Sequence, residues 1–242
     1  MIPLRYLPRP DGNAVAYRSR SGWGPAILFL PGYMSDMEGG KATALDSWGE
    51  AEGRAMIRLD YRGCGSSGGG FEDFGLADWL EDVLAVIDEV VQGPVVLVGS
   101  SMGGWLMLLA ALARPERVAA LVGIAPAPDF TSWGFTDEQK RAIREEGRLV
   151  ETIPYGEQPY VTTRRFWESG ESLLLLGAEV AIDCPVRLLH GQADGDVPWG
   201  ISLKLAERLR SPDVRVSLIK DGDHRLSRPQ DIALLTATVA EL

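Results

Sequence analysis

Residues 95–113 read VVLVGSSMGGWLMLLAALA, and this stretch decides the fold. A short apolar run leads into Gly-Ser-Ser-Met-Gly, and an apolar segment with a helical pattern follows at once. A strand, a sharp turn and a helix in this order let a Gly-x-Ser-x-Gly sequence hold a serine hydroxyl clear of the backbone. Gly99 and Gly103 flank Ser101, whereas the same spacing around Ser100 would place a valine at the first glycine position. The pattern therefore predicts Ser101 as a nucleophile on such a turn, a nucleophile elbow.

The remainder of the chain alternates between short apolar runs and amphipathic segments. Strands are expected at residues 26–30, 55–60, 118–124, 185–190 and 214–219, and helices at residues 39–48, 73–91, 198–209 and 230–242. Continuous apolar runs are typical of strands buried on both faces, and their alternation with helices predicts a mostly parallel sheet with helices on both faces. Residues 4–17 precede this pattern and are expected to form a hairpin. The predicted fold class is α/β.

One long segment, residues 130–182, interrupts this alternation. It has no buried-strand signal, and it mixes charged helical stretches with scattered aromatic residues. These are Phe130, Trp133, Phe135, Tyr155, Tyr160, Phe166 and Trp167. We expect a small helical cap or lid over the carboxyl edge of the sheet, inserted into a single domain of residues 1–242. Surface helices whose aromatic side chains pack on the main core are the alternative interpretation.

The composition limits the classes of protein and partner. The chain has 242 residues, of which 45% are hydrophobic, and this suffices for one large α/β domain. A net charge of −10 argues against nucleic acid as a partner, because nucleic-acid-binding surfaces are basic. No apolar run reaches the ~18 residues of a transmembrane helix, so no membrane span is expected. The oligomeric state is left open.

The cysteines and the N-terminal residues bear on location and on metal binding. Cys64 and Cys184 lie far apart without CxxC spacing, so neither a disulfide framework nor a zinc site is expected. Reduced thiols are typical of cytosolic proteins. Residues 1–10 contain no long apolar segment of the kind that marks a signal peptide. We therefore expect a cytoplasmic protein that needs no cofactor and no metal ion.

The two histidines are the candidates for the base that Ser101 needs, because a serine hydroxyl is a poor nucleophile until a base takes its proton. His190 ends a predicted strand, and His224 lies in the loop before the last helix. Both positions are at carboxyl ends of strands, where sites form in open α/β sheets. The order serine, acid, histidine along the chain favours His224, since His190 precedes every acid in its own loop. We interpret His190 as a structural residue.

Asp194 is the predicted acid. It stands in a His-Gly-x-x-Asp sequence after the strand that precedes His224, which is the usual place for the acid in this order. Asp196 shares the loop and remains an alternative, because only one of the two can bind the imidazole. Asp129, after the preceding strand, is a more remote alternative, and Asp223 is expected only to bind backbone near the base.

Two backbone N–H groups are expected to stabilise the oxyanion that forms during acyl transfer. One belongs to Met102, directly after the nucleophile and at a helix N-terminus, where the helix dipole favours negative charge. The other should come from the loop after the first buried parallel strand. The N–H of Tyr33, in the sequence Pro-Gly-Tyr, is the candidate there.

Four motifs together resemble those of the α/β-hydrolases of the serine-hydrolase superfamily. They are LPG at residues 30–32, DYRGCGSS at 60–67, GSSMGG at 99–104 and HGQADGDVP at 190–198. A closer similarity is to the mitochondrial palmitoyl-protein thioesterases of this superfamily, also known as acyl-glucuronide esterases. It lies in residues 98–108, 184–191, 197–199 and 223–225. The resemblance implies the α/β-hydrolase fold with Ser101 as nucleophile, Asp194 as acid and His224 as base. No transit peptide is visible, and we do not expect a mitochondrial location from the resemblance.

These residues predict a serine hydrolase that cleaves acyl esters or thioesters of small molecules or acylated proteins through an acyl-enzyme. A palmitoyl-protein thioesterase, a small-ester carboxylesterase and an acyl-glucuronide esterase all fit the elbow. The aromatic residues of the predicted cap, with Trp105 and Trp199, suggest an apolar acyl pocket, although core packing would explain them equally. The alternative from another class is a non-catalytic ligand-binding protein with the same fold, which would have no need of a complete triad.

Overall fold

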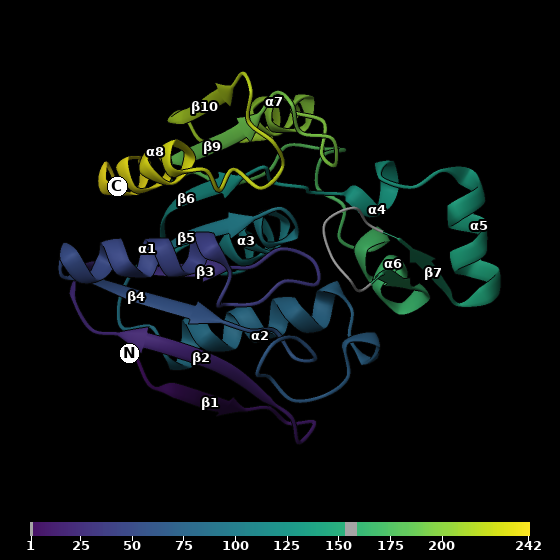
Figure 1. Ribbon diagram of the computed structural model, residues 1–242, viewed down its shortest axis with the longest axis horizontal. Helices are drawn as coiled ribbons and strands as arrows, with labels where there is room; N and C mark the ends of the chain where they lie inside the picture. The colour runs from purple at the N-terminus through teal and green to yellow at the C-terminus, as the bar shows by residue number, and fades with distance from the viewer. Residues whose placement is uncertain (1, 153–158) are drawn as a thin grey trace.

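A sheet of eight strands forms the centre of the molecule. The computed structural model describes residues 2–152 and 159–242, and within them the sheet has the order β1-β2-β4-β3-β5-β6-β9-β10 (Figure 1). β2 is antiparallel to both of its neighbours, and the other neighbouring strands are parallel. The strands are β1 (Leu4–Pro8), β2 (Ala14–Arg20), β3 (Trp23–Leu30), β4 (Arg54–Leu59), β5 (Val95–Ser100), β6 (Val118–Ile124), β9 (Val186–Gly191) and β10 (Val214–Ile219). The predicted α/β fold is confirmed.

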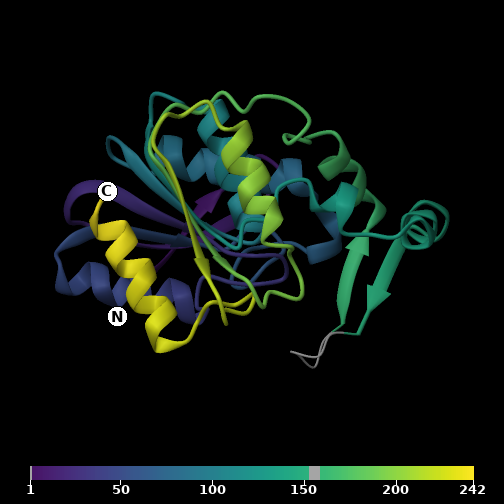
Figure 2. The ribbon, with the colours of Figure 1, turned by 90° about the horizontal axis from the view of Figure 1, so that it is seen from above.

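Helices cover both faces of the sheet, as the alternation predicts. These helices are α1 (Gly40–Ala51), α2 (Leu76–Glu89), α3 (Met102–Ala113), α7 (Gly200–Arg208) and α8 (Pro229–Ala240). Figure 2 shows α1 and α8 together on one side of the sheet. Leu45 of α1 and Leu235 of α8 belong to one apolar core, whereas Leu76, Trp105 and Leu205, from α2, α3 and α7, belong to the core on the other face. The two cores hold the sheet rigidly between them.

The two strands that precede Ser101 and Asp194 are buried from end to end. Every residue of β5 and of β9 is buried, which matches the continuous apolar runs of the sequence. Both strands run parallel to the strand between them, β6. The loops that follow β5 and β9 therefore leave the sheet at the same edge, and this brings together residues that are far apart in the chain.

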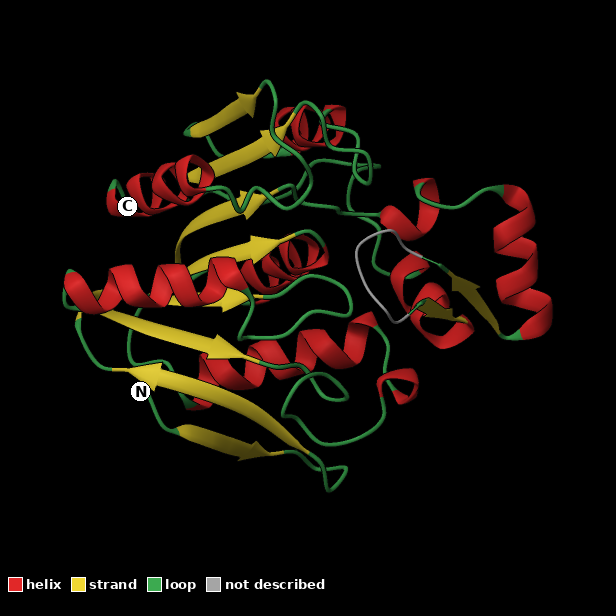
Figure 3. Ribbon diagram, in the orientation of Figure 1, coloured by secondary structure: helices red, strands yellow, loops and turns green. Residues whose placement is uncertain are grey.

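The segment between β6 and β9 lies beyond the carboxyl ends of the parallel strands (Figures 1 and 3). It contains α4 (Phe130–Trp133), α5 (Asp137–Glu146), β7 (Arg148–Glu151), β8 (Tyr160–Thr163) and α6 (Arg164–Glu171). β7 and β8 form a two-stranded antiparallel sheet that the sequence did not predict, because strands of four residues with mixed polarity carry no clear periodic signal. Residues 153–158, with Tyr155, lie outside the described residues. We propose that residues 130–182 are the cap of a single domain.

The aromatic residues of this segment divide into two groups. Phe166 of α6 is 1% exposed and belongs to the main core, with its ring 5.5 Å from that of Trp79 in α2. Core packing, the alternative interpretation, therefore accounts for Phe166. Phe130, Trp133 and Tyr160 instead line a cleft above the sheet, so these side chains are available to a substrate.

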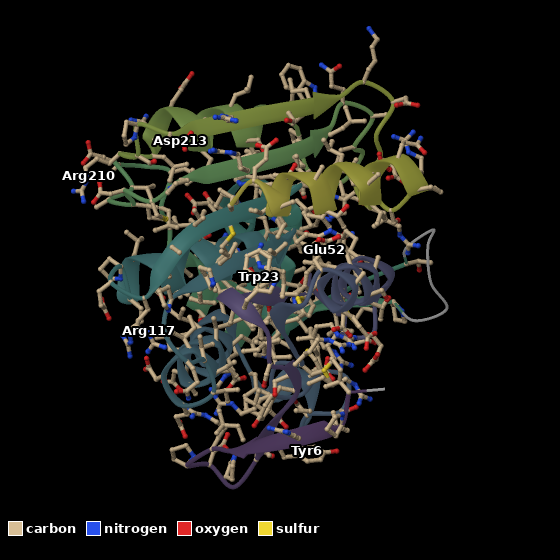
Figure 4. The ribbon with its side chains drawn as sticks, turned by 90° about the vertical axis from the view of Figure 1, so that its left-hand side faces the viewer. Tyr6, Trp23, Glu52, Arg117, Arg210 and Asp213 are labelled. Atoms are coloured by element: carbon tan, nitrogen blue, oxygen red, sulfur yellow. The ribbon has the colours of Figure 1, made fainter. Side chains whose placement is uncertain are left out.

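The end of the sheet opposite the cap is closed by polar contacts (Figure 4). Arg117 donates hydrogen bonds to the carbonyls of Ile87, Val91 and Gly93, at 2.9, 3.0 and 3.2 Å. The carbonyls at the end of a helix lack donors within the helix. Arg117 satisfies this group where α2 ends, and so fixes the connection between α2 and β5.

Candidate active site

Ser101 lies at the junction of β5 and α3, where the sequence places the elbow. Its backbone has φ 54° and ψ −118°, a combination that costs a non-glycine residue on the order of 1–3 kcal/mol. Two hydrogen bonds to the end of β6 and the segment after it hold Ser101: its N–H donates to the carbonyl of Ile124 at 2.9 Å, and its carbonyl accepts from the N–H of Ala127 at 3.1 Å. The backbone of Ser101 is therefore both strained and held in place, as is typical of the serine in a nucleophile elbow.

The glycines on either side of Ser101 leave no room for a side chain. A Cβ at Gly99 would lie 2.3 Å from the carbonyl oxygen of Gly103, and a Cβ at Gly103 would lie 2.1 Å from the carbonyl oxygen of Leu30. A Cβ at Gly104 would lie 2.6 Å from Pro126. The turn requires the backbones of β3, β5 and α3 to approach one another closely, and this is possible only because these positions are glycines.

The structure brings Ser101, His224 and Asp194 together. The Nε2 of His224 lies 3.1 Å from the hydroxyl of Ser101, and its Nδ1 lies 2.8 Å from Oδ2 of Asp194. The Asp194 side chain is buried, whereas 22% of the His224 side chain is exposed. In this geometry the hydroxyl donates to Nε2, and Nδ1–H donates to the carboxylate. The imidazole is thus held in the tautomer that can accept a proton from Ser101.

Asp194 is bound on both of its carboxylate oxygens. Oδ1 accepts hydrogen bonds from the N–H groups of Asp196 and Val197, at 2.9 and 2.8 Å. Burial raises the pKa of a carboxyl, but the contacts of Asp194 with His190, His224 and Val197 outweigh it and hold the pKa of this carboxyl well below its usual range. Asp194 is therefore ionised wherever the protein is folded near neutral pH.

The alternatives considered for the acid have other contacts. Asp196 is exposed and offers its backbone N–H to Asp194. Asp129 is buried, and its carboxylate accepts the N–H groups of Leu175 and Leu176, both at 2.8 Å. Asp129 thus fastens the returning end of the cap segment to the end of β6, and its role is structural.

His190 is fully buried at the end of β9, and it has contacts that the sequence did not reveal. Its Nε2 lies 3.0 Å from the carbonyl of Val197, so this nitrogen carries the hydrogen, and the hydroxyl of Ser202 lies 2.7 Å from Nδ1. The same Nε2 lies 3.2 Å from Oδ2 of Asp194. His190 therefore supports the loop that carries the acid. A structural role for His190 is predicted from the sequence, but this contact is not, because periodicity gives no signal for it.

The N–H groups expected at the oxyanion belong to Met102 and Tyr33. Met102 is the first residue of α3, so its N–H has no partner within the helix. Tyr33 follows Gly32, where a Cβ would lie 3.4 Å from that of Ser101. Among the described residues, no hydrogen bond engages the N–H of Tyr33. Both donors remain predictions for the oxyanion.

A cleft of about 840 Å³ opens above Ser101 and His224. Apolar side chains from the cap segment line one part, and these are Phe130, Trp133, Phe135 and Tyr160. The lining also includes the polar residues Ser35, Asp36 and Lys41. Burial lowers the pKa of the Lys41 ammonium to about 8. The aromatic side chains of the cap segment thus give an aromatic wall to the cleft that the candidate nucleophile lines.

A metal ion would have to compete with hydrogen bonds at this site. Asp194, Asp196 and His224 offer ligand atoms within 4.8 Å of one another. However, Asp194 already accepts two backbone N–H groups and the imidazole N–H. These hydrogen bonds are typical of a catalytic acid and base rather than of metal ligands, and we interpret Asp194 and His224 in this way.

Comparison with known proteins defines the family. Residues 25–148 match a family model described as alpha/beta hydrolase fold. Over 99% of its length the chain is 42% identical to palmitoyl-protein thioesterase ABHD10, mitochondrial, of Rattus norvegicus, and 43% identical to the protein of that name from Homo sapiens, covering 82% and 79% of them. The structure matches alpha/beta hydrolase domain-containing protein 10 from mouse with a TM-score of 0.91 and 42% identity, covering 99% of this chain and 97% of that one. A putative hydrolase from Agrobacterium vitis S4 gives a TM-score of 0.93 at 37% identity, covering 100% and 98%.

The chain therefore belongs to the α/β-hydrolase family. Its relatives and structural neighbours carry the names of hydrolases, and this confirms the predicted enzyme class. In the part of the chain that the structure describes, no helix is both long and apolar enough to cross a membrane.

The predicted cytoplasmic location is wrong. The rat and human relatives, which match 99% of the chain, are named mitochondrial proteins. The prediction rested on two cysteines without a disulfide pattern and on the lack of an apolar leader. Neither feature distinguishes the cytosol from another compartment that keeps thiols reduced. These two features therefore gave no physical basis for choosing the cytosol.

Replacing Gly103 by Ala tests the packing of the elbow. The new Cβ would lie 2.1 Å from a backbone oxygen of Leu30, so either the turn shifts or the protein unfolds, at a cost of more than about 3 kcal/mol. Thermal unfolding and hydrolysis of a p-nitrophenyl ester measure both effects. Gly200→Ala is the matched control, because a Cβ there meets nothing within 4 Å. Unchanged stability and activity in Gly103→Ala would contradict the close packing described above.

Replacing Asp194 by Asn tests its ionisation. The unfolded chain protonates this carboxyl near 3.8, whereas the folded protein holds the pKa lower. The stability that the carboxylate contributes is therefore complete above pH 3.8 and is lost as the pH falls towards the lowered value. Urea unfolding should show a deficit for Asp194→Asn at pH 7 that narrows at pH 3. Asp196→Asn, in the exposed part of the same loop, serves as control. A deficit that is the same at both pH values would refute the lowered pKa.

Proposed function

We propose that this protein is a serine hydrolase that cleaves acyl esters or thioesters through Ser101, His224 and Asp194. The observation that carries the proposal is the continuous line of contacts at the floor of the cleft, 3.1 Å from hydroxyl to imidazole and 2.8 Å from imidazole to carboxylate. The order of the three residues along the chain is that of other α/β-hydrolases. A ligand-binding protein would gain nothing from a strained serine in line with an oriented base.

In the proposed mechanism the Oγ of Ser101 attacks the acyl carbonyl while Nε2 of His224 takes the hydroxyl proton. Asp194 accepts a hydrogen bond from Nδ1–H of His224 and stabilises the imidazolium that forms. The N–H groups of Met102 and Tyr33 donate to the oxyanion of the tetrahedral intermediate. When the intermediate collapses, the bond to the alcohol or thiol breaks, and the leaving group takes the proton from His224. Water then attacks the acyl-enzyme with the same base, and this releases the acid and restores the serine.

The acyl group is proposed to occupy the part of the cleft that the cap segment lines. Phe130, Trp133 and Phe135 present apolar surface there, and each CH₂ of an acyl chain that leaves water contributes about 0.8 kcal/mol. The relatives from rat and human are named palmitoyl-protein thioesterases. We therefore propose long-chain acyl thioesters, carried on proteins or on small molecules, as the preferred substrates.

The nucleophile is tested by comparing two adjacent serines. Ser101→Ala should lower kcat for a p-nitrophenyl ester on the order of 10⁴–10⁶-fold, as in other triads, and should abolish labelling by a fluorophosphonate probe. Ser100→Ala is the matched control and should keep activity within tenfold, because the hydroxyl of Ser101 and not that of Ser100 is in line with His224. The mechanism is wrong if Ser101→Ala retains turnover or if Ser100→Ala loses it.

The substrate class is tested by acyl length. We expect kcat/KM to rise along a series of p-nitrophenyl esters from acetate to palmitate, because each added methylene covers more of the aromatic wall. An S-palmitoyl-cysteine peptide should be hydrolysed, and the S-acetyl peptide should be slower. Trp133→Ala, which removes part of that wall, should flatten the series while leaving the acetate rate within a fewfold. A steep preference for acetate in the wild type would contradict a long-acyl substrate.

A further inference from the structure

The loop that carries Tyr33, residues 31–37, is attached to the sheet at its two ends. The hydroxyl of Tyr61 donates to the carbonyl of Pro31 at 3.0 Å. The N–H of Met37 donates to the carboxylate of Asp60 at 2.7 Å. Tyr61 and Asp60 directly follow β4 in the chain, so the core of the domain holds both ends of this loop.

The Tyr33 ring, in the middle of the loop, packs on Phe71 and Trp79 of the main core, with ring centroids 5.3 and 6.1 Å away, and Tyr33 also contacts the cap segment. The hydroxyl of Tyr33 donates to the carbonyl of Val161 in β8 at 2.6 Å, a contact between residues 128 positions apart in the chain. The Tyr33 ring lies 4.7 Å from the ring of Phe166, which also belongs to the cap segment. Burial raises the pKa of the Tyr33 hydroxyl, so it stays protonated and able to donate.

The backbone around Tyr33 can link the contact of the Tyr33 side chain with the cap segment to the position of the Tyr33 N–H. Tyr33 lies between Gly32, whose Cα faces Ser101, and Met34, which has a positive φ of 51°. The carbonyl of Gly32 accepts from the N–H of Ser35 at 3.2 Å, which closes a tight turn. Because this bond closes the turn, we expect the orientation of the Tyr33 side chain to be linked to that of the peptide that carries the Tyr33 N–H.

We propose that the Tyr33 hydroxyl is a positioning group that ties the oxyanion donor to the cap: its hydrogen bond to Val161 holds the Tyr33 N–H aligned with Ser101. The inference rests on the proposed function, in which that N–H stabilises the oxyanion. Cap position and oxyanion stabilisation are then coupled, and a substrate that seats the cap correctly also aligns the donor. Misplacement of a catalytic group by about 1 Å can lower the rate on the order of 100-fold. The loss of one hydrogen bond that positions the Tyr33 N–H can therefore have a large effect on the rate.

Tyr33→Phe removes the hydroxyl and keeps the ring and the backbone N–H. We expect kcat for a p-nitrophenyl ester to fall about tenfold, with KM within twofold, because the donor acts on the transition state. The inhibition constant of a trifluoromethyl ketone, which forms an oxyanion with the serine, should rise by the same factor. Tyr6→Phe, the same change at an exposed residue of β1 (Figure 4), should alter none of these quantities.

The outcomes separate the inference from the proposed function. An active wild type and an equally active Tyr33→Phe, with unchanged ketone inhibition, would overturn the role of the hydroxyl while leaving the mechanism intact. A fall in kcat without weaker ketone inhibition would also overturn it, because the loss would then not act through the oxyanion. An inactive wild type that no fluorophosphonate labels would refute the proposed function itself. Thermal unfolding within about 3 °C of wild type shows that Tyr33→Phe is folded.

Discussion

The backbone of Ser101 is held in a conformation that costs energy, and the rest of the site depends on that constraint. A φ of 54° turns the chain from β5 into α3 within one residue. The turn fits only because Gly99 and Gly103 let three backbones approach where any Cβ would collide. β6 completes the support, since Ile124 and the segment after it bind both backbone groups of Ser101. The buried sheet thus provides the energy that keeps the serine strained.

A second constraint fixes the direction in which protons move. Asp194 lies between two imidazoles: Nδ1 of His224 is 2.8 Å away and Nε2 of His190 is 3.2 Å away. With Oδ1 bound to two backbone N–H groups, the carboxylate has little tendency to take a proton. In the mechanism we propose, the proton from Ser101 therefore stays on His224, from which it passes to the leaving group. The loops after β9 and β10 supply this arrangement.

Much of this organisation could be predicted from the sequence. The elbow is a local pattern, since the glycines around Ser101 and the apolar runs beside it are contiguous, and chain order then selects His224. The strands at 118–124 and 214–219 have the predicted bounds. The first is a nearly continuous apolar run that is buried, and the second alternates between apolar and polar residues at the edge of the sheet. These features depend on residues that are neighbours in the chain or that follow one order.

The parts that were missed depend on contacts between distant residues. β7 and β8 are too short for their periodicity to be read. The contact of Tyr33 with Val161 spans 128 positions, and the contact of His190 with Asp194 depends on how a loop folds back onto a strand. The location was wrong for a different reason, because reduced thiols occur in more than one compartment. Local patterns therefore predicted the three residues that the structure brings together, whereas the contacts of the site with the cap segment could be seen only in the structure.

The acyl-enzyme is the central claim, and it can be observed directly. Rapid acid quenching of the protein with a slow S-acyl substrate, followed by peptide mass spectrometry, locates the acyl group during turnover. We predict one added acyl mass on the peptide that contains Ser101, at a level that rises and falls with turnover. Turnover without an acyl group on Ser101, or with the acyl group on another residue, would contradict it.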